Sequence, residues 1–203
     1  MQEIRFHGRG GQGTVVASVI LAKAFFSVGY YVQTFPHFGV ERRGAPVEAY
    51  LRLDKKKILI RSNVYNPDAV IVQDRKLLET ANVTRGLKPG GWILINSPVP
   101  PENLEPFNGY KLAQVDATGI AVENKLGTGT HPMMNTAMAG AFSAIMEILP
   151  LDAVTAAIQA EISVKPEQNV RAATLAFEAV TSIGMVNQCD CPGKTKETGN
   201  RIK

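Results

Sequence analysis

Seven short stretches of the chain show either alternation of apolar and polar residues or a short apolar run, and both patterns are typical of strands. Six other stretches repeat apolar residues at helical spacing. Clusters of Pro, Gly and Asn between them predict turns, as at residues 66–68 and 88–91. The predicted strands cover residues 2–7, 30–35, 47–53, 58–61, 69–73, 92–96 and 110–115. The predicted helices cover residues 14–27, 76–81, 118–125, 135–148, 151–161 and 167–183.

The order of these elements indicates an α/β fold. Strands and helices alternate through the first two thirds and are followed by helices alone, which favours a mainly parallel Rossmann-like or flavodoxin-like sheet flanked by helices. The short polar connection 54–57 predicts an antiparallel hairpin between residues 47–53 and 58–61. We expect one domain over residues 1–186, and an extended C-terminal arm over 187–203, where apolar periodicity is lost.

Composition limits the classes of function. The chain has 203 residues, of which 45% are hydrophobic and 20% charged, as expected of one globular domain. Its net charge of +4 favours acidic ligands or partners, but no basic, aromatic-rich stripe predicts nucleic-acid binding. The longest apolar runs are too short to span a membrane, and the start lacks the pattern of a secretory signal. We therefore expect a cytoplasmic protein.

Cysteine usage points the same way. Cys189 and Cys191 are the only cysteines, and they are too close in sequence for an easy disulfide. Reduced thiols fit a reducing compartment. The pair lacks the further ligands of a zinc or iron–sulfur site, so no metal site is expected in this chain. The role of the two cysteines stays open.

A glycine-rich turn is the sharpest local signal. Gly8-Arg9-Gly10-Gly11-Gln12-Gly13 lies between the first predicted strand and the first predicted helix. Glycines there allow a tight turn and close approach of a ligand, and the helix N-terminus favours phosphate. A turn that serves packing alone is the competing interpretation. No Asp or Glu ends the second strand to bind ribose hydroxyls, so NAD is not indicated.

Two other loops carry candidate binding residues. Arg42 and Arg43 follow the second strand, and paired guanidinium groups there suit phosphate or carboxylate. Residues 127–135 form a glycine-rich entry to a helix, with Thr130 as a candidate ligand contact and Asn135 as a candidate cap. Ordinary solvated or capped loops are the alternatives. The lone histidines are not tied by spacing to a nucleophile or a carboxylate, so no catalytic residue is predicted.

Three segments together resemble a known family. They are residues 4–13 (IRFHGRGGQG), 35–47 (FPHFGVERRGAPV) and 135–141 (NTAMAGA). In this order and spacing the chain resembles, over about residues 2–185, the gamma subunit of pyruvate and other 2-oxoacid:ferredoxin oxidoreductases. The glycine motif of that family falls on Gly8, Gly10, Gly11, Gln12 and Gly13.

The resemblance implies a function shared with other chains. The family oxidatively decarboxylates a 2-oxo acid, usually with coenzyme A, to acyl-CoA, CO₂ and reduced ferredoxin. It implies thiamine pyrophosphate and Mg between alpha and beta subunits, and [4Fe-4S] clusters in the beta and ferredoxin-like delta subunits. The gamma subunit would cover the active-site entrance and help bind coenzyme A. An independent nucleotide-dependent oxidoreductase and a purely structural scaffold are the alternatives, and the particular 2-oxo acid, the acyl acceptor and the stoichiometry stay open.

Overall fold

A seven-stranded sheet forms the centre of the computed structural model, which describes residues 1–37 and 44–187. The strand order is β2-β3-β1-β4-β5-β6-β9. Strands β1, β4, β5 and β6 pair in parallel, whereas β3 is antiparallel to both β1 and β2, and β9 is antiparallel to β6. The strands are β1 (Gln2–Arg9), β2 (Tyr31–His37), β3 (Pro46–Asp54), β4 (Ala69–Val72), β5 (Trp92–Asn96), β6 (Lys111–Val115) and β9 (Thr181–Met185).

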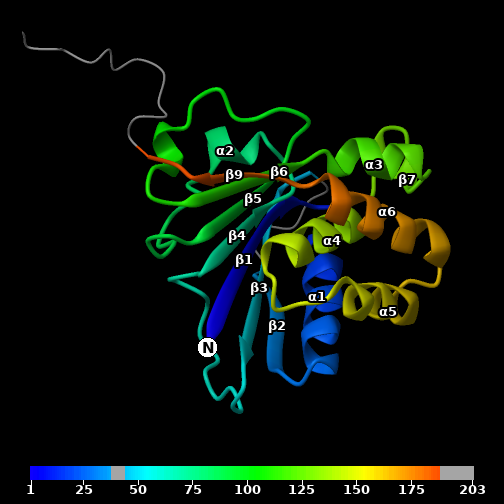
Figure 1. Ribbon diagram of the computed structural model, residues 1–203, viewed down its shortest axis with the longest axis horizontal. Coiled ribbons are helices and arrows are strands. Elements are labelled where there is room, and N and C mark those ends of the chain that lie inside the picture. Colours follow the sequence, from blue (N-terminus) through cyan, green and yellow to red (C-terminus); the bar gives the residue numbers. More distant parts are fainter. Residues whose placement is uncertain (38–43, 188–203) are drawn as a thin grey trace, which may run out of the picture.

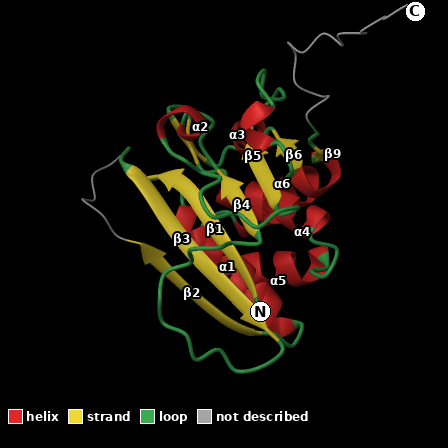
Figure 2. Cartoon of the chain, turned by 90° about the vertical axis from the view of Figure 1, so that its left-hand side faces the viewer, coloured by secondary structure: helices red, strands yellow, loops and turns green. Residues whose placement is uncertain are grey.

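Four helices cover one face of this sheet, as Figures 1 and 2 show from two sides. They are α1 (Thr14–Ser27), α4 (Asn135–Ile145), α5 (Leu151–Glu161) and α6 (Pro166–Ala179). Over β4 to β6 the other face is covered by α2 (Leu77–Thr80) and by loops that bury Val83, Leu87 and Phe107. The remaining elements are α3 (Ala117–Glu123), the 3₁₀ turn Glu105–Phe107 and the small hairpin β7 (Gly127–Thr128) and β8 (His131–Pro132). The predicted α/β fold is therefore confirmed.

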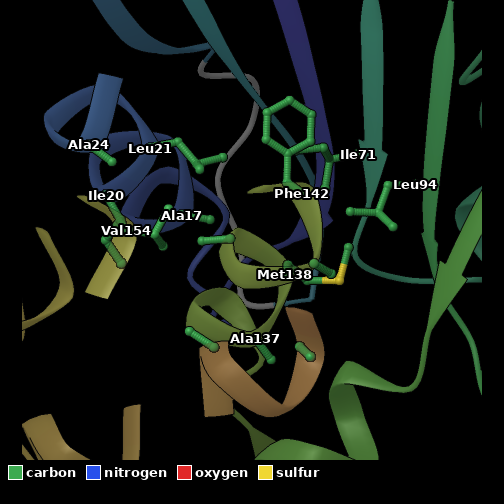
Figure 3. Close-up of a cluster of buried hydrophobic side chains, with 14 of the residues drawn as sticks. Ala17, Ile20, Leu21, Ala24, Ile71, Leu94, Ala137, Met138, Phe142 and Val154 are labelled. Atoms are coloured by element: carbon green, nitrogen blue, oxygen red, sulfur yellow. The ribbon is translucent and has the colours of Figure 1, made fainter. Parts of the chain in front are cut away.

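Helix α4 lies at the centre of the larger hydrophobic core. Ten of its eleven residues are buried, so this helix is enclosed by the protein nearly all round. Figure 3 shows Phe142 beside Ile71 of β4, with Met138 on the side that faces Leu94 of β5. Since α4 fits between the sheet and its neighbouring helices, its position fixes the N-terminus that enters the candidate site.

Helices α4 and α6 run parallel at very close range. The hydroxyl of Thr136 donates to Asn169 Oδ1 at 3.0 Å, and one turn further along Gly140 lies against the main chain of Ala173. A Cβ atom at Gly140 would overlap the Ala173 carbonyl group. Both helices therefore begin at the same end of the molecule, which is the end where the parallel strands finish.

Two predicted elements are wrong. Residues 58–61 form no strand, because β3 already pairs with β1 on one edge and β2 on the other. The antiparallel hairpin exists, but it joins β2 to β3. The predicted helix 167–183 ends at Ala179, and Thr181–Met185 becomes β9, which pairs with the free edge of β6.

Within the described residues, no helix is long and apolar enough to cross a membrane. Most of the predicted arm lies outside these residues.

Candidate functional site

The glycine loop joins β1 to α1 at the carboxyl edge of the parallel strands. A Cβ atom at Gly8 would overlap Thr14 Oγ1 and approach Gln73 Oε1 to 2.7 Å, where the Thr14 hydroxyl now donates to Gln73 at 2.6 Å. Gly13 has a left-handed φ of 76° and lies against Asn135 of α4. These two glycines let α1 pack closely on the end of β4 and on α4.

The turn between them is held by side chains. The Arg9 amide donates to Gln12 Oε1 at 2.8 Å, and Arg9 Nε donates to Asp74 Oδ2 at 2.7 Å. Gln12 Nε2 reaches the same carboxylate oxygen at 3.3 Å. Asp74 follows β4 closely, so the carboxyl end of the neighbouring parallel strand supplies the clamp. The loop is thereby rigid before any ligand arrives.

The beginning of β3 is bound to the same loop. Gly10 donates its amide hydrogen to the Ala45 carbonyl at 2.9 Å, and Gly44 donates to the Gly10 carbonyl at 3.1 Å. Arg42 and Arg43 lie outside the described residues. Gly44, the described residue that follows Arg43 in the sequence, is thus held beside the glycine turn.

The β7–β8 hairpin forms the opposite wall of a cavity of about 410 Å³. Thr130 Oγ1 lies 2.9 Å from His131 Nδ1 and 3.3 Å from Thr128 Oγ1, so a short hydrogen-bonded row of hydroxyl and imidazole groups follows the hairpin. The cavity is lined by Arg9, Gly10, Gly11, Gln12, Gly44, Thr130, His131, Pro132 and Met134.

Three helix N-termini converge at this edge. The α1 and α4 N-termini meet where Gly13 contacts Asn135, and α6 begins beside α4 through the bond from Thr136 to Asn169. No side-chain cap and no acidic residue in the first turn occupies the N-terminus of α1 or α4. The helix dipoles, together with first-turn amide groups of α1 that no side chain caps, favour negative charge, so the edge suits an anion.

A second cavity of about 490 Å³ lies on the other side of the hairpin. Leu126, Gly127 and Met133 line it from the hairpin side. The connection from α5 to α6 supplies Ile162, Ser163 and Val164.

His7 is buried and neutral and belongs to a different network. Its side chain faces away from the helices, with Arg5 Nε donating to Nε2 at 3.0 Å and Glu48 Oε1 lying 3.5 Å from Nδ1. Since Nε2 accepts a hydrogen bond, the proton of the neutral ring is on Nδ1. Burial lowers the pKa of His7 to about 4, and the attraction of Glu48 opposes this only in part. His7 is therefore part of the framework.

The structure brings together only part of the predicted site. Gly10, Gly11, Gln12 and Thr130 line one cavity, whereas Gly8 and Gly13 lie in the packing beneath it. Asn135 is the first residue of α4, whose cap is Met134, so its predicted capping role is wrong. The Asn135 side chain instead accepts from the Thr136 amide at 3.0 Å.

Sequence reasoning missed the Arg9–Asp74 pair and the place of His131 in the cavity wall. A signal for Asp74 was present, since it comes soon after the strand that pairs in parallel with β1. His131 lies in the glycine-rich segment 127–135 that the sequence marks as a candidate loop, but the β7–β8 hairpin that presents its side chain has only two residues in each strand and is not predicted.

The fold and the cavity define a class of protein: an α/β domain in which a strand-to-helix glycine turn lines a cavity at the carboxyl edge of the parallel strands. Comparison with known proteins points to one family. A family model described as pyruvate ferredoxin/flavodoxin oxidoreductase matches residues 3–179. The chain is 51% identical over 178 residues to pyruvate synthase subunit PorC of Methanocaldococcus jannaschii, covering 87% of this chain and 96% of that protein.

Two other similar proteins agree. The common gamma subunit of the pyruvate/ketoisovalerate oxidoreductases of Thermococcus kodakarensis is 50% identical over 181 residues, with 87% of this chain and 96% of that protein covered. The crystal structure of pyruvate oxidoreductase subunit PORC from Thermotoga maritima superposes with a TM-score of 0.76 at 35% identity, covering 90% and 98% of the two chains.

The chain therefore belongs to the pyruvate ferredoxin/flavodoxin oxidoreductase family. Within it, the chain is a gamma subunit and a non-autonomous part of a 2-oxoacid:ferredoxin oxidoreductase. The resemblance found in the sequence is confirmed.

Proposed function

We propose that this gamma subunit supports thiamine-dependent oxidative decarboxylation of a 2-oxo acid to acyl-CoA and CO₂ by binding phosphate groups of coenzyme A. In this proposal the glycine loop and the β7–β8 hairpin hold the nucleotide end of coenzyme A. The domain at the same time closes the entrance to an active site that other subunits build.

One observation carries the proposal: the uncapped N-terminus of α1 opens beside a rigid cavity lined by Gly10, Gly11, Gln12 and Thr130. Coenzyme A carries a diphosphate and a 3′-phosphate, and helix N-termini and glycine amides bind such groups well. Thr130 supplies a hydroxyl group for a further hydrogen bond. Arg42 and Arg43, which precede Gly44 in the sequence, are proposed to add guanidinium groups, whose planar geometry suits phosphate.

The proposal divides the chemistry among subunits. Thiamine pyrophosphate with Mg is assigned to the alpha and beta subunits, and [4Fe-4S] clusters to the beta and ferredoxin-like delta subunits. Electrons then leave to ferredoxin or another acceptor. The role of this chain is to bind and orient the acyl acceptor and to exclude water, so its residues affect the use of coenzyme A more than the oxidation of the 2-oxo acid.

Steady-state kinetics of the assembled enzyme test this role. In an Arg42→Ala/Arg43→Ala variant we expect the KM for coenzyme A to rise about tenfold or more, because each lost charge-assisted hydrogen bond contributes about 1.5 kcal/mol or more. The KM for the 2-oxo acid should stay within about twofold. Thr130→Val should raise the same KM by a smaller factor, because a neutral hydrogen bond is weaker.

Arg171→Ala, which removes an exposed arginine from α6, is the matched control and should change neither constant. An unchanged KM for coenzyme A in variants that still assemble would favour a purely structural subunit. Oxidoreductase activity or a bound chromophore in the purified chain alone would instead favour the independent enzyme.

A further inference from the structure

The loop between β3 and β4 exposes apolar side chains within a basic segment. Leu59 and Ile60 have 79% and 46% of their surface exposed. Cationic side chains flank them on both sides: Lys55, Lys56, Lys57 and Arg61. No acidic residue occurs between positions 55 and 61. In Figure 2 this loop projects beyond the edge of the sheet before it crosses back over the strands.

The main chain of this segment is also available for contact. Residues 57–61 run without a turn or bend, and within the described residues no backbone hydrogen bond joins them to the rest of the chain. Their sequence favours a strand, but β3 has no free edge to accept one. Ile58, Leu59 and Ile60 therefore keep strand-forming side chains outside the sheet.

Both ends of the segment are fixed. At its start, the Lys56 amide donates to Asp54 Oδ1 at 3.1 Å and the Lys55 ammonium group lies over the Tyr30 ring. At its end, Val64 is buried and the Asn63 carbonyl accepts from Arg52 Nη2 at 3.0 Å. The exposed residues thus lie in a loop that is fixed at both ends. Fixing the loop in this way lowers the entropy cost of binding a partner.

We propose that residues 55–61 dock on another subunit of the oxidoreductase, at a surface with an apolar centre bordered by carboxylates. Charge complementarity selects an acidic border, because the segment carries four cations and no anion. The exposed Leu59 and Ile60 supply apolar surface that would be buried against the centre of such a partner surface. The segment follows Asp54, which lies at the opposite end of the β1–β3 pair from Arg9 and the glycine loop. Docking there leaves the cavity open.

Co-expression with the partner subunits tests this surface. We expect Leu59→Asp/Ile60→Asp to weaken association at least tenfold and to deplete the partner subunits from the complex isolated through this chain. The melting temperature of the purified chain should not change. Lys56→Glu/Lys57→Glu should weaken association most at low ionic strength, because salt screens the lost attraction. Val122→Asp replaces a residue with 51% exposure on α3 and serves as the control that should assemble normally.

Normal assembly of the Leu59/Ile60 variant would overturn the proposal. Loss of self-association with intact binding of the other subunits would also overturn it, because the occupant would then be a second copy of this chain. The KM for coenzyme A in complexes that do form reports on the glycine-loop proposal separately.

Discussion

A few buried polar residues determine how the sheet is held on the face opposite the helices. Arg5 reaches the carbonyl oxygens of Val83 and Arg85 at 2.9 and 2.6 Å, and its Nε donates to His7. Tyr50 donates its hydroxyl hydrogen to Glu48 at 2.8 Å, and burial together with this bond raises the pKa of Tyr50. Buried polar groups stabilise only when they are paired, so this network depends on His7 staying neutral.

The first prediction concerns acid stability. The pKa of His7 is about 4 in the folded chain, below its ordinary value of 6.5, so the unfolded chain binds the proton more readily. The stability that comes from neutral His7 is therefore fully present above about pH 6.5 and is lost as the pH falls toward 4. We expect the free energy of unfolding to fall by about 2 kcal/mol between pH 7 and pH 5 from this residue alone.

Denaturant unfolding at the two pH values measures this effect. In the His7→Gln variant, most of this loss of stability between pH 7 and pH 5 should disappear. In the His131→Gln variant, which changes an exposed histidine, the loss should be as large as in the parent chain. An equal pH dependence in the His7 variant and the parent chain would show that another group titrates.

The second prediction separates the two kinds of glycine in the site region. Gly8→Ala should lower the free energy of unfolding by about 2 kcal/mol or more, because the added methyl group collides with Thr14 and Gln73. Gly129→Ala should stay within about 0.5 kcal/mol, since nothing lies within 4 Å of its added Cβ atom. Thermal unfolding of both variants gives the comparison. Equal stabilities would mean that the glycine turn has no packing role.

At the scale of elements, close packing of α4 on α6 positions helix N-termini beside the two cavities. The third prediction is that Gly140→Ala destabilises the chain by about 2–4 kcal/mol, because the methyl group would collide with the Ala173 carbonyl. This loss should exceed the gain of about 1 kcal/mol that alanine brings to an isolated helix. Gln159→Ala, on the exposed face of α5, is the control that should change stability little. A stabilised Gly140 variant would contradict the observed separation of the helices.

The elements also show which features the sequence can predict. The glycine turn, α1 and the four strands of the parallel region follow from local pattern, because each combines its own periodicity with its own turn residues. The fates of residues 58–61 and 181–185 do not, because they depend on which strand edges remain free after the rest of the sheet has formed. The same limit applies to the site: the motif predicts Gln12, whereas Asp74 reaches the glycine loop, and His131 the cavity wall, only through tertiary packing.

For the whole molecule, our two proposals concern surfaces at opposite ends of the β1–β3 pair. The glycine loop and its cavity lie at the end near Arg9, and the loop after Asp54 lies at the other. Under these proposals the subunit holds a ligand at one end while it is anchored at the other. The activity of the complex should therefore respond to mutations at the two ends in different ways, through the KM for coenzyme A at one end and through assembly at the other.

Photo-crosslinking of the assembled enzyme with an azido derivative of coenzyme A is the most direct measurement of the central claim. Peptide mapping should place the adduct in this chain, within residues 8–14 or 127–134, and excess coenzyme A should suppress it. Saturable labelling confined to the other subunits, with these two segments unmodified, would contradict the assignment of the coenzyme A site to the glycine loop.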